Sequence, residues 1–221
     1  MSILNIIDSH ELIIETSLSF RDIQRLTLPK SIFREPSKSL KIIDENREML
    51  GWWPSIEAFL DPICIDTHFS FVIKRRLAAM AMPSFYVRDI EKEISFLFKM
   101  KIHFIINLTD LNYRDYRYRK EFKVIDIPIA DFDAPSFEQM DKIWNIFRKS
   151  NDNKRLCIHC VAGRGRTGTV LACLLGKYLH LSPDKAIEKV RRMRPGSIET
   201  GAQEEFIWDY LYTIEDQSLK S

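Results

Sequence analysis

The chain has 221 residues, of which 45% are hydrophobic, and its 33 Lys and Arg against 31 Asp and Glu leave a net charge of +2. A chain of this size can bury a substantial core and fits one ordinary domain with an extension. The balanced charge excludes a strongly basic protein, so we expect no nucleic-acid partner. The sequence has no apolar run long enough to span a membrane, and its first eight residues lack the features of a signal peptide.

The first 65 residues show no repeat and no clear periodicity, and we interpret them as an N-terminal extension with short helices. Trp52 and Trp53 stand out in this segment because two adjacent tryptophans are costly to leave in water. Packing of this pair onto the main domain is favoured over a partner-binding role.

From about residue 66 the pattern becomes regular. Asp89 is a candidate N-cap for a helix whose apolar positions repeat at helical spacing, and residues 102–108 then form a continuous apolar run typical of a buried strand. Residues 112–120 are aromatic and basic. A solvated loop or short helix is favoured there over a substrate-binding rim.

The second half of the chain repeats this alternation. Strand signals at residues 123–129 and 155–158 enclose a helix with a capping box, Ser136 to Gln139, and apolar helices follow near residues 168–175, 183–193 and from about 200. Alternating strands and helices predict an α/β fold with a central mostly parallel sheet flanked by helices.

A nine-residue stretch, His159-Cys-Val-Ala-Gly-Arg-Gly-Arg-Thr167, lies where a predicted strand runs into a predicted helix. Only seven glycines occur in the chain, yet Gly163, Gly165 and Gly168 fall within six positions. Glycines let a loop turn successive N–H groups toward one centre, and a helix N-terminus favours an anion. The stretch therefore predicts a phosphate-binding loop.

The same loop offers chemistry as well as binding. A thiol at such a position readily becomes a thiolate, which makes Cys160 a candidate nucleophile. Arg166 can fold back so that its planar fork binds the oxygens of a transferring phosphoryl group, and Thr167 can donate its hydroxyl to the sulfur. The alternative is a glycine-rich capping turn with a buried cysteine and solvated arginines. The order of these residue types favours catalysis.

This stretch resembles the Cys-x5-Arg signature of protein tyrosine phosphatases. From Phe69 to about Tyr212 the chain is similar to the small atypical dual-specificity phosphatases of the VHZ type. That likeness rests on Pro-Ile-Ala-Asp-Phe, residues 128–132, and Arg-Pro-Gly-Ser-Ile-Glu-Thr-x-x-Gln, residues 194–203. The resemblance implies the same sheet fold, a cysteinyl-phosphate intermediate, and no metal or organic cofactor.

The resemblance also implies roles for individual residues. It assigns the general acid to Asp131, although Asp133 can also reach from the same loop, and it gives His159 a role in stiffening the loop. Gln203 either orients the hydrolytic water or merely completes a capping box with Thr200. The phosphate-binding residues that it implies form one segment of the loop: Val161, Ala162, Gly163, Arg164, Gly165 and Arg166.

The four cysteines, at positions 64, 157, 160 and 173, show no metal-ligand spacing, so no metal site is expected. Cys157 is interpreted as a core residue, with a redox partnership to Cys160 as the less favoured alternative. A nucleophilic thiol works only when reduced, which favours a cytoplasmic location.

We therefore expect an N-terminal extension over residues 1–65, a catalytic domain over residues 66–215 and a short tail over residues 216–221. The predicted function is hydrolysis of phosphate monoesters on phosphotyrosine, phosphoserine or phosphothreonine proteins. Arg164 adds a cation inside the loop, which keeps a phosphoinositide substrate open. A phosphate-binding adaptor that no longer turns over is the alternative from another class.

Overall fold

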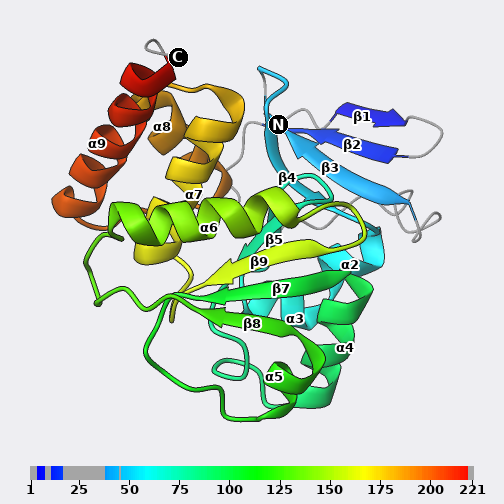
Figure 1. The fold of residues 1–221 in the computed structure, drawn as a ribbon. Helices are drawn as coiled ribbons and strands as arrows, with labels where there is room; N and C mark the ends of the chain where they lie inside the picture. Colours follow the sequence, from blue (N-terminus) through cyan, green and yellow to red (C-terminus); the bar gives the residue numbers. More distant parts are fainter. Residues whose placement is uncertain (1–3, 8–10, 17–37, 45, 219–221) are drawn as a thin grey trace.

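The computed structural model describes residues 4–7, 11–16, 38–44 and 46–218. In this part of the chain nine strands form one sheet, in the order β1-β2-β3-β4-β5-β6-β9-β7-β8 (Figure 1). The strands are β1 (Leu4–Ile7), β2 (Glu11–Glu15), β3 (Ser39–Ile43), β4 (Met49–Trp53), β5 (Ser70–Ile73), β6 (Leu77–Met80), β7 (Ile102–Asn107), β8 (Lys123–Asp126) and β9 (Arg155–His159). The predicted α/β fold with flanking helices is confirmed.

The sheet is parallel over β6, β9, β7 and β8, as the alternation of strands and helices predicts. The strands before β6 make the whole sheet mixed, because β3 to β6 are joined by antiparallel pairings. Strand β9 lies between β6 and β7 and is buried along its whole length. Its carboxyl end therefore lies between the ends of two other parallel strands.

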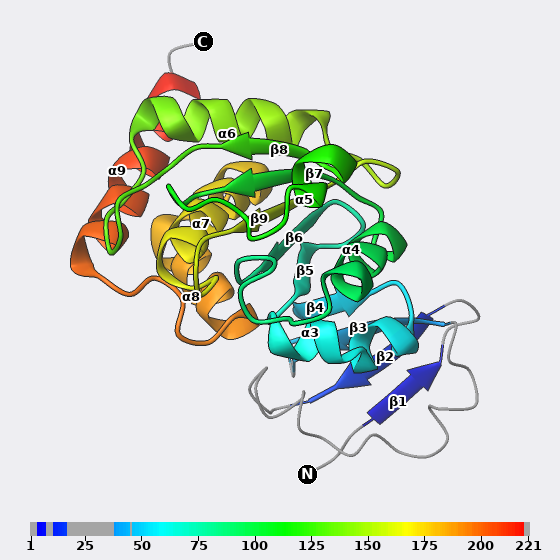
Figure 2. The same cartoon turned by 90° about the horizontal axis from the view of Figure 1, so that it is seen from below.

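The helices cover both faces of the sheet (Figures 1 and 2). They are α2 (Ile56–Leu60), α3 (Pro62–Asp66), α4 (Ile90–Lys99), α5 (Arg117–Glu121), α6 (Phe137–Lys149), α7 (Gly165–Leu179), α8 (Pro183–Met193) and α9 (Gly201–Ser218). One core cluster joins α2 to α5 with one face of the sheet, and a second joins α6 to α9 with the other. Helix α7 is buried over its first twelve residues, so it forms the centre of the second layer.

Local signals in the sequence explain several helix starts. Asp89 accepts a hydrogen bond from the Lys92 N–H at the start of α4. Ser136 and Gln139 form the predicted capping box of α6, with each side chain bonded to the backbone of the other residue. Both N-caps are at the positions that the sequence predicts, and they determine where α4 and α6 begin.

The expectation of short helices in the N-terminal segment is correct for α2 and α3 only. The other described elements of that segment, β1 to β4, are strands that continue the sheet of the following residues. Trp52 and Trp53 are buried, at 1% and 0% exposure, and Trp52 packs edge-on against Phe71 of β5. The interpretation that the tryptophan pair packs on the main domain is confirmed. The end of the predicted tail, residues 219–221, lies outside the described residues.

Candidate active site

The phosphate-loop segment, residues 160–164, connects the end of β9 to the first residue of α7. Cys160 is 3% exposed and lies directly after His159, the last residue of the central strand. The loop ends at the N-terminus of a fifteen-residue helix, where unpaired N–H groups and the helix dipole favour an anion. The structure thus places the predicted loop at the carboxyl edge of parallel strands, the usual position of ligand sites in such sheets.

The loop conformation depends on Gly163. Its φ is +69°, and a Cβ at this position would collide with the backbone carbonyl of Met80. Two carbonyl groups of the loop accept hydrogen bonds from the residues packed behind it. The Val161 carbonyl accepts from the Met82 N–H at 2.9 Å, and the Gly163 carbonyl accepts from Arg194 at 3.1 Å. Because the N–H of a trans peptide points away from its carbonyl, these bonds turn the following N–H groups to the opposite side of the loop.

Arg166 joins the loop to the segment that follows β8. Its side chain is 6% exposed, and its Nη1 donates to the carbonyl of Ile129 at 3.0 Å. Its Nη2 lies 2.8 Å from the Asp131 carboxylate, which is 68% exposed. The structure therefore brings Arg166 and Asp131 together, although they are far apart in the sequence.

Asp133 has a different environment from Asp131. Its carboxylate accepts from the N–H of Ala134, and its carbonyl accepts from the Gln203 side chain at 3.1 Å. Asp133 thus shapes the turn, while Asp131 contacts the arginine of the loop. Thr167 is fully buried at the start of α7, and among the described residues its hydroxyl has no hydrogen-bond partner.

Gln203 is buried and lies next to the loop. Its Oε1 accepts from the N–H of Glu199 at 2.8 Å, and its own N–H donates to the Thr200 hydroxyl. Only one arm of the predicted capping box is present, because the side chain reaches Glu199 rather than Thr200. A Cβ on Gly165 would meet both the Glu199 and Gln203 side chains, so these two side chains lie against the loop.

His159 is fully buried beneath the loop. Its Nδ1 donates to the Cys160 carbonyl at 3.1 Å, and its Nε2 therefore accepts from the Tyr113 hydroxyl at 2.6 Å. Burial lowers the pKa of His159 to about 4, and burial also raises the pKa of Tyr113. The imidazole is neutral at neutral pH and ties the backbone of Cys160 to the loop between β7 and α5.

Arg194, just after α8, supports the loop from behind. It is 6% exposed, and besides Gly163 it donates to the carbonyls of His68 and Ala79 and to the Ser70 hydroxyl. Burial lowers the pKa of Arg194 to about 10, so the guanidinium stays charged at neutral pH. A fixed positive charge therefore lies beneath the Gly163 carbonyl.

The four cysteines are free and buried. Cys157 belongs to the core cluster on the α2 to α5 side of the sheet, and Cys160 belongs to the cluster on the other side. Burial raises the pKa of the Cys157 thiol. The interpretation of Cys157 as a core residue agrees with this placement.

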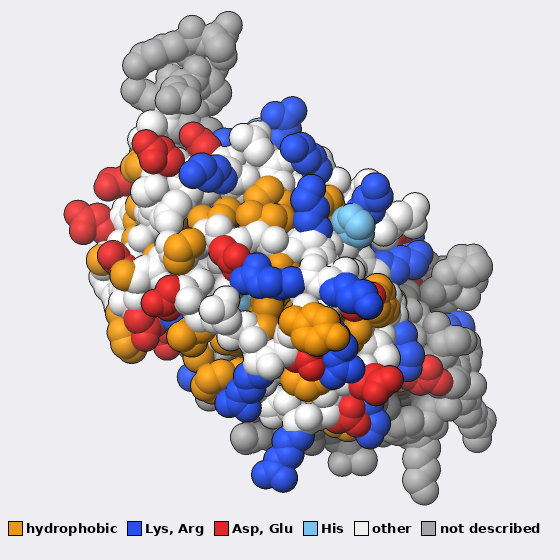
Figure 3. Space-filling model, turned by 60° about the horizontal axis from the view of Figure 1, so that its bottom comes forward, with side chains coloured by type: hydrophobic (Ala, Val, Ile, Leu, Met, Phe, Trp, Pro, Cys, Tyr) orange, Lys and Arg blue, Asp and Glu red, His pale blue; other side chains and the backbone are white. Residues whose placement is uncertain are grey.

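Within the described part of the chain, no cluster of three or more His, Cys, Asp or Glu side chains is placed to hold a metal ion. A search of the same residues finds no helix that could span a membrane. On the face drawn in Figure 3, acidic side chains interrupt the basic ones, and hydrophobic side chains lie between them.

Sequence reasoning missed three residues of this region. Tyr113 lies in the aromatic segment for which we expect a solvated loop or short helix; the short helix is present as α5, yet Tyr113 itself is 9% exposed and bonded to His159. Arg194 and Glu199 lie inside the second motif quoted for the family resemblance, but their roles were not assigned. The position of Arg194 in that motif could have indicated a role at the site. Nothing in the sequence indicates that Tyr113 bonds to His159.

Comparison with known proteins agrees with the geometry. Residues 66–207 match a family model described as the Swiss Army Knife protein, DSP-PTPase phosphatase domain. An uncharacterised protein of Methanocaldococcus jannaschii is 35% identical over 96 residues, which cover 42% of this chain and 63% of that protein. The tyrosine-protein phosphatase cdc-14 of Caenorhabditis elegans is 34% identical over 110 residues, 48% of this chain and 15% of that protein.

Among solved structures, Tk-PTP in its active form is 32% identical, with a TM-score of 0.53 over 62% of this chain and 92% of that one. PTPMT1 has a TM-score of 0.58 at 16% identity, over 69% of this chain and 99% of that one, a likeness that concerns the fold alone. The chain thus spans at most 63% of the curated relatives named here and nearly all of the solved domains.

A cysteine between the end of a buried parallel strand and the N-terminus of a helix, with an arginine in the first turn of that helix, is the arrangement typical of cysteine-dependent phosphatases. Within that class the match over residues 66–207 is decisive, and the chain belongs to the dual-specificity phosphatase family of the protein tyrosine phosphatase superfamily, among its atypical members.

Proposed function

We propose that the protein hydrolyses phosphate monoesters through a cysteinyl-phosphate intermediate. The observation that carries this proposal is the contact of 2.8 Å between Arg166 and Asp131, which joins the start of α7 to the segment after β8 beside the loop that begins at Cys160. These three groups supply a nucleophile, a cation for the transferring phosphoryl group and a carboxyl group at the open side of the site.

In the first step the Cys160 thiolate attacks phosphorus, and the bond between phosphorus and the ester oxygen breaks. Asp131 gives its proton to the departing alkoxide, which leaves as the alcohol. Arg166 and the N–H groups of residues 161–166 bind the phosphoryl oxygens throughout, where charge gathers in the transition state.

In the second step water attacks the cysteinyl phosphate, Asp131 takes the proton of that water, and the thiolate leaves with inorganic phosphate as the other product. The Thr167 hydroxyl is buried in the first turn of α7 and has no hydrogen-bond partner among the described residues. This supports a role for Thr167 as the hydrogen-bond donor to the departing sulfur. Gln203 lies against Gly165 and is a candidate to orient the water, although its amide is engaged with Glu199 and Asp133 in this state.

The ion pair between Arg166 and Asp131 has a consequence for substrate binding. A phosphate that enters the loop competes with Asp131 for the arginine, and a dianion with two oxygens in the plane of the fork is the better partner. Substrate binding therefore releases Asp131 from Arg166, and without that cation the carboxylate more readily takes up the proton that it donates to the leaving group.

For the substrate we propose phosphorylated tyrosine, serine or threonine on proteins, which the similarity to cdc-14 supports. Phosphoinositides are the second candidate, because Arg164 adds a cation beside the scissile phosphate. The phosphatidylglycerophosphate phosphatase PTPMT1 of Arabidopsis thaliana, 32% identical over 80 residues that cover 36% of this chain and 24% of that protein, is a lipid-directed relative. We also propose a cytoplasmic location, because the nucleophilic thiol must stay reduced. The proposed catalytic domain comprises residues 66–215.

The test is turnover of p-nitrophenyl phosphate by the wild type and by Cys160→Ser, with rapid acid quench to trap the phosphoenzyme. We expect turnover and an acid-stable cysteinyl phosphate in the wild type only, while the serine variant retains binding of phosphate esters. A wild type without turnover that still binds phosphate esters would identify an adaptor instead.

A further inference from the structure

Two chain segments flank the phosphate loop at the carboxyl edge of the sheet. The segment after β6 is bonded to the loop through the Met82 N–H and the Val161 carbonyl, at 2.9 Å. The segment after β7 runs beside Cys160, because the Leu108 N–H donates to the His159 carbonyl at 2.9 Å. The carboxyl ends of parallel strands meet at one edge of a sheet, so both segments emerge on the edge where the phosphate loop lies.

These two segments are also joined to each other. The Arg114 N–H donates to the Ser84 hydroxyl at 3.1 Å. The Arg114 guanidinium lies over the ring of Phe85, 5.2 Å from its centroid, and the ring of Tyr86 packs edge-on against Phe85. Phe85 and Tyr86 are 41% and 46% exposed, and Arg114 is exposed as well. These three side chains form an aromatic and basic surface beside the phosphate loop.

The other arginines of the same segment have acidic partners. Arg117 donates to both oxygens of the Asp115 carboxylate, and Arg119 pairs with Asp126 at 2.8 Å. The acidic residue next to Arg114 in the sequence is therefore already occupied. Within the part of the chain that the structure describes, the Arg114 side chain makes no hydrogen bond and no ion pair, and it contacts the Phe85 ring instead.

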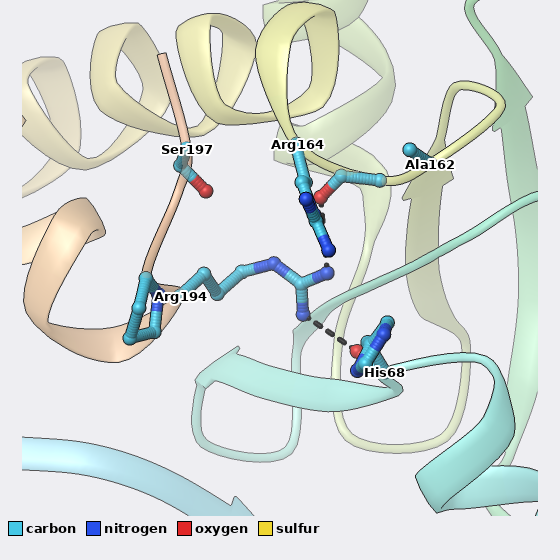
Figure 4. Close-up of a pocket in the computed structure, with 7 residues that line it drawn as sticks. His68, Ala162, Arg164, Arg194 and Ser197 are labelled. Carbon is cyan, nitrogen blue, oxygen red and sulfur yellow. Dashed lines mark hydrogen bonds between the residues drawn. The ribbon is translucent and has the colours of Figure 1, made fainter. Parts of the chain in front are cut away.

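The arginines that support the phosphate loop are held in a different way. Arg166 is 6% exposed and pairs with Asp131. Arg194 is also 6% exposed and donates to the His68 carbonyl at 2.8 Å, a bond drawn in Figure 4. Both side chains are buried and have partners within the chain. Arg114 is exposed, so its position fits a partner that comes from outside.

The contact with Phe85 leaves the binding edge of the Arg114 guanidinium free. Guanidinium groups stack flat on aromatic rings, so their N–H donors point outward in the plane of the group. Two parallel N–H donors of this plane match the two oxygens of a carboxylate. Because the ring holds the arginine in place, less side-chain freedom is lost when the carboxylate binds.

We propose that Arg114 binds a carboxylate of the substrate, and that the protein prefers phosphorylated segments with an acidic residue near the phosphorylated one. The proposal rests on the proposed phosphatase activity and deepens its first substrate class, phosphoproteins. It assigns to residues 112–120 the substrate-binding rim that the sequence leaves as the less favoured interpretation. An extended peptide advances about 3.3 Å per residue, so we expect the acidic residue within about three positions of the phosphate.

The test compares three phosphotyrosine peptides. They carry glutamate on the N-terminal side of the phosphotyrosine, glutamate on the C-terminal side, or glutamine on both sides. Arg114→Gln removes the charge and keeps a long polar side chain. Arg88→Gln makes the same charge change at another exposed arginine of the segment after β6 and is the matched control. Arg114→Glu reverses the charge, and peptides with lysine in the same positions are its substrates.

We expect the wild type to hydrolyse at least one glutamate peptide with a kcat/KM about threefold to fivefold above that of the glutamine peptide, as an exposed ion pair allows. Arg114→Gln should abolish this preference, and Arg114→Glu should prefer the lysine peptide. Arg88→Gln should keep the wild-type ratio. Because an ion pair carries the preference, the ratio should fall as the salt concentration rises.

A wild type without the preference, or a preference that Arg114→Gln leaves intact, would overturn the proposal. An equal loss on all peptides and on p-nitrophenyl phosphate would also overturn it, because Arg114 would then support the loop rather than bind the substrate. Hydrolysis of soluble inositol phosphates but of no phosphopeptide would overturn it in favour of the other substrate class.

Binding of the same peptides to Cys160→Ser, measured by fluorescence anisotropy, gives the preference without turnover. The double variant with Arg114→Gln should bind the glutamate and glutamine peptides equally. A wild type that does not turn over p-nitrophenyl phosphate would refute the phosphatase activity, whereas the binding ratio would still show whether Arg114 selects the acidic peptide.

Discussion

Asp44 and Arg192 form an ion pair between the turn that joins β3 to β4 and the last turn of α8. Asp44 is 4% exposed, and its other oxygen accepts from the N–H groups of Asn46 and Glu48. A second ion pair, Lys189 with Glu48 at 2.9 Å, joins the same two elements. Since α8 leads directly into Arg194, the segment that precedes the family match is attached to the helix that supports the loop.

Asp44→Asn should therefore lower stability by about 1–2 kcal/mol, because it removes the charge from a buried pair while keeping the shape of the side chain. Urea unfolding at neutral pH measures this. Glu48→Gln is the matched control, since the Glu48 side chain is 48% exposed and its pairs are worth only a few tenths of a kcal/mol. Equal losses in the two variants would contradict the special position of Asp44.

The burial of Trp53 leads to a second stability prediction. Its indole is 0% exposed, packs edge-on against Phe59 and donates to the Cys64 sulfur at 3.2 Å. Trp53→Ala should cost about 3–5 kcal/mol, the usual cost of removing a large core side chain. Tyr116→Ala, at a side chain that is 77% exposed, should change stability by less than about 0.5 kcal/mol.

Deletion of residues 1–65 should lower stability even more, because it removes β4, the strand that pairs with β5. A truncated chain that melts at the temperature of the full chain would show that these residues form an independent arm. That outcome would favour a partner-binding arm, the less favoured of the two interpretations of the sequence.

His159 gives the protein a pH-dependent stability. Its pKa is about 4 in the folded chain, because of burial, against an ordinary value near 6.5. Between these values the unfolded chain binds a proton that the folded chain does not, so stability falls as pH drops from about 6.5 to about 4. The loss should be on the order of 2 kcal/mol by about pH 5.

The measurement is urea unfolding of the wild type and of His159→Gln at about pH 7.5 and about pH 5. Carboxylates also contribute to acid destabilisation, but they are common to both proteins, so the difference between the two pH slopes isolates the histidine. If the glutamine variant loses as much stability as the wild type, His159 is not neutral in the folded chain.

The sequence was sufficient wherever structure depends on local chemistry. The caps at Asp89 and Ser136, the buried strand before Cys160 and the loop itself follow from residue types at fixed spacing. The strands of the first 53 residues were not predicted, because each is fixed by pairing with a neighbouring strand, in a chain of pairings from β1 to β4 that ends where β4 pairs with β5. Tyr113 and Arg194 were missed for the same reason: their partners, His159 and Gly163, become neighbours only through the fold.

The last prediction distinguishes Asp131 from Asp133 as the general acid. Asp131 contacts Arg166 at 2.8 Å, while Asp133 binds the N–H of Ala134 and, through its carbonyl, Gln203. Asp131→Asn should lower kcat for an alkyl or tyrosyl phosphate by about 10²–10⁴-fold and flatten the alkaline limb of the pH–rate profile, because the acid that this limb reports is gone. For a substrate whose leaving group needs no proton, the loss should be much smaller.

Asp133→Asn is the matched control, and it should leave the ratio between good and poor leaving groups unchanged, since its carboxylate serves the turn rather than the substrate. Loss of the ion pair with Arg166 also removes a competitor for the arginine, so Asp131→Asn should bind phosphate esters at least as tightly as the wild type. This combination of slower turnover, unchanged or lower KM and dependence on the leaving group identifies an acid rather than a structural residue. If Asp133→Asn shows the combination and Asp131→Asn does not, the acid lies two residues further along the loop.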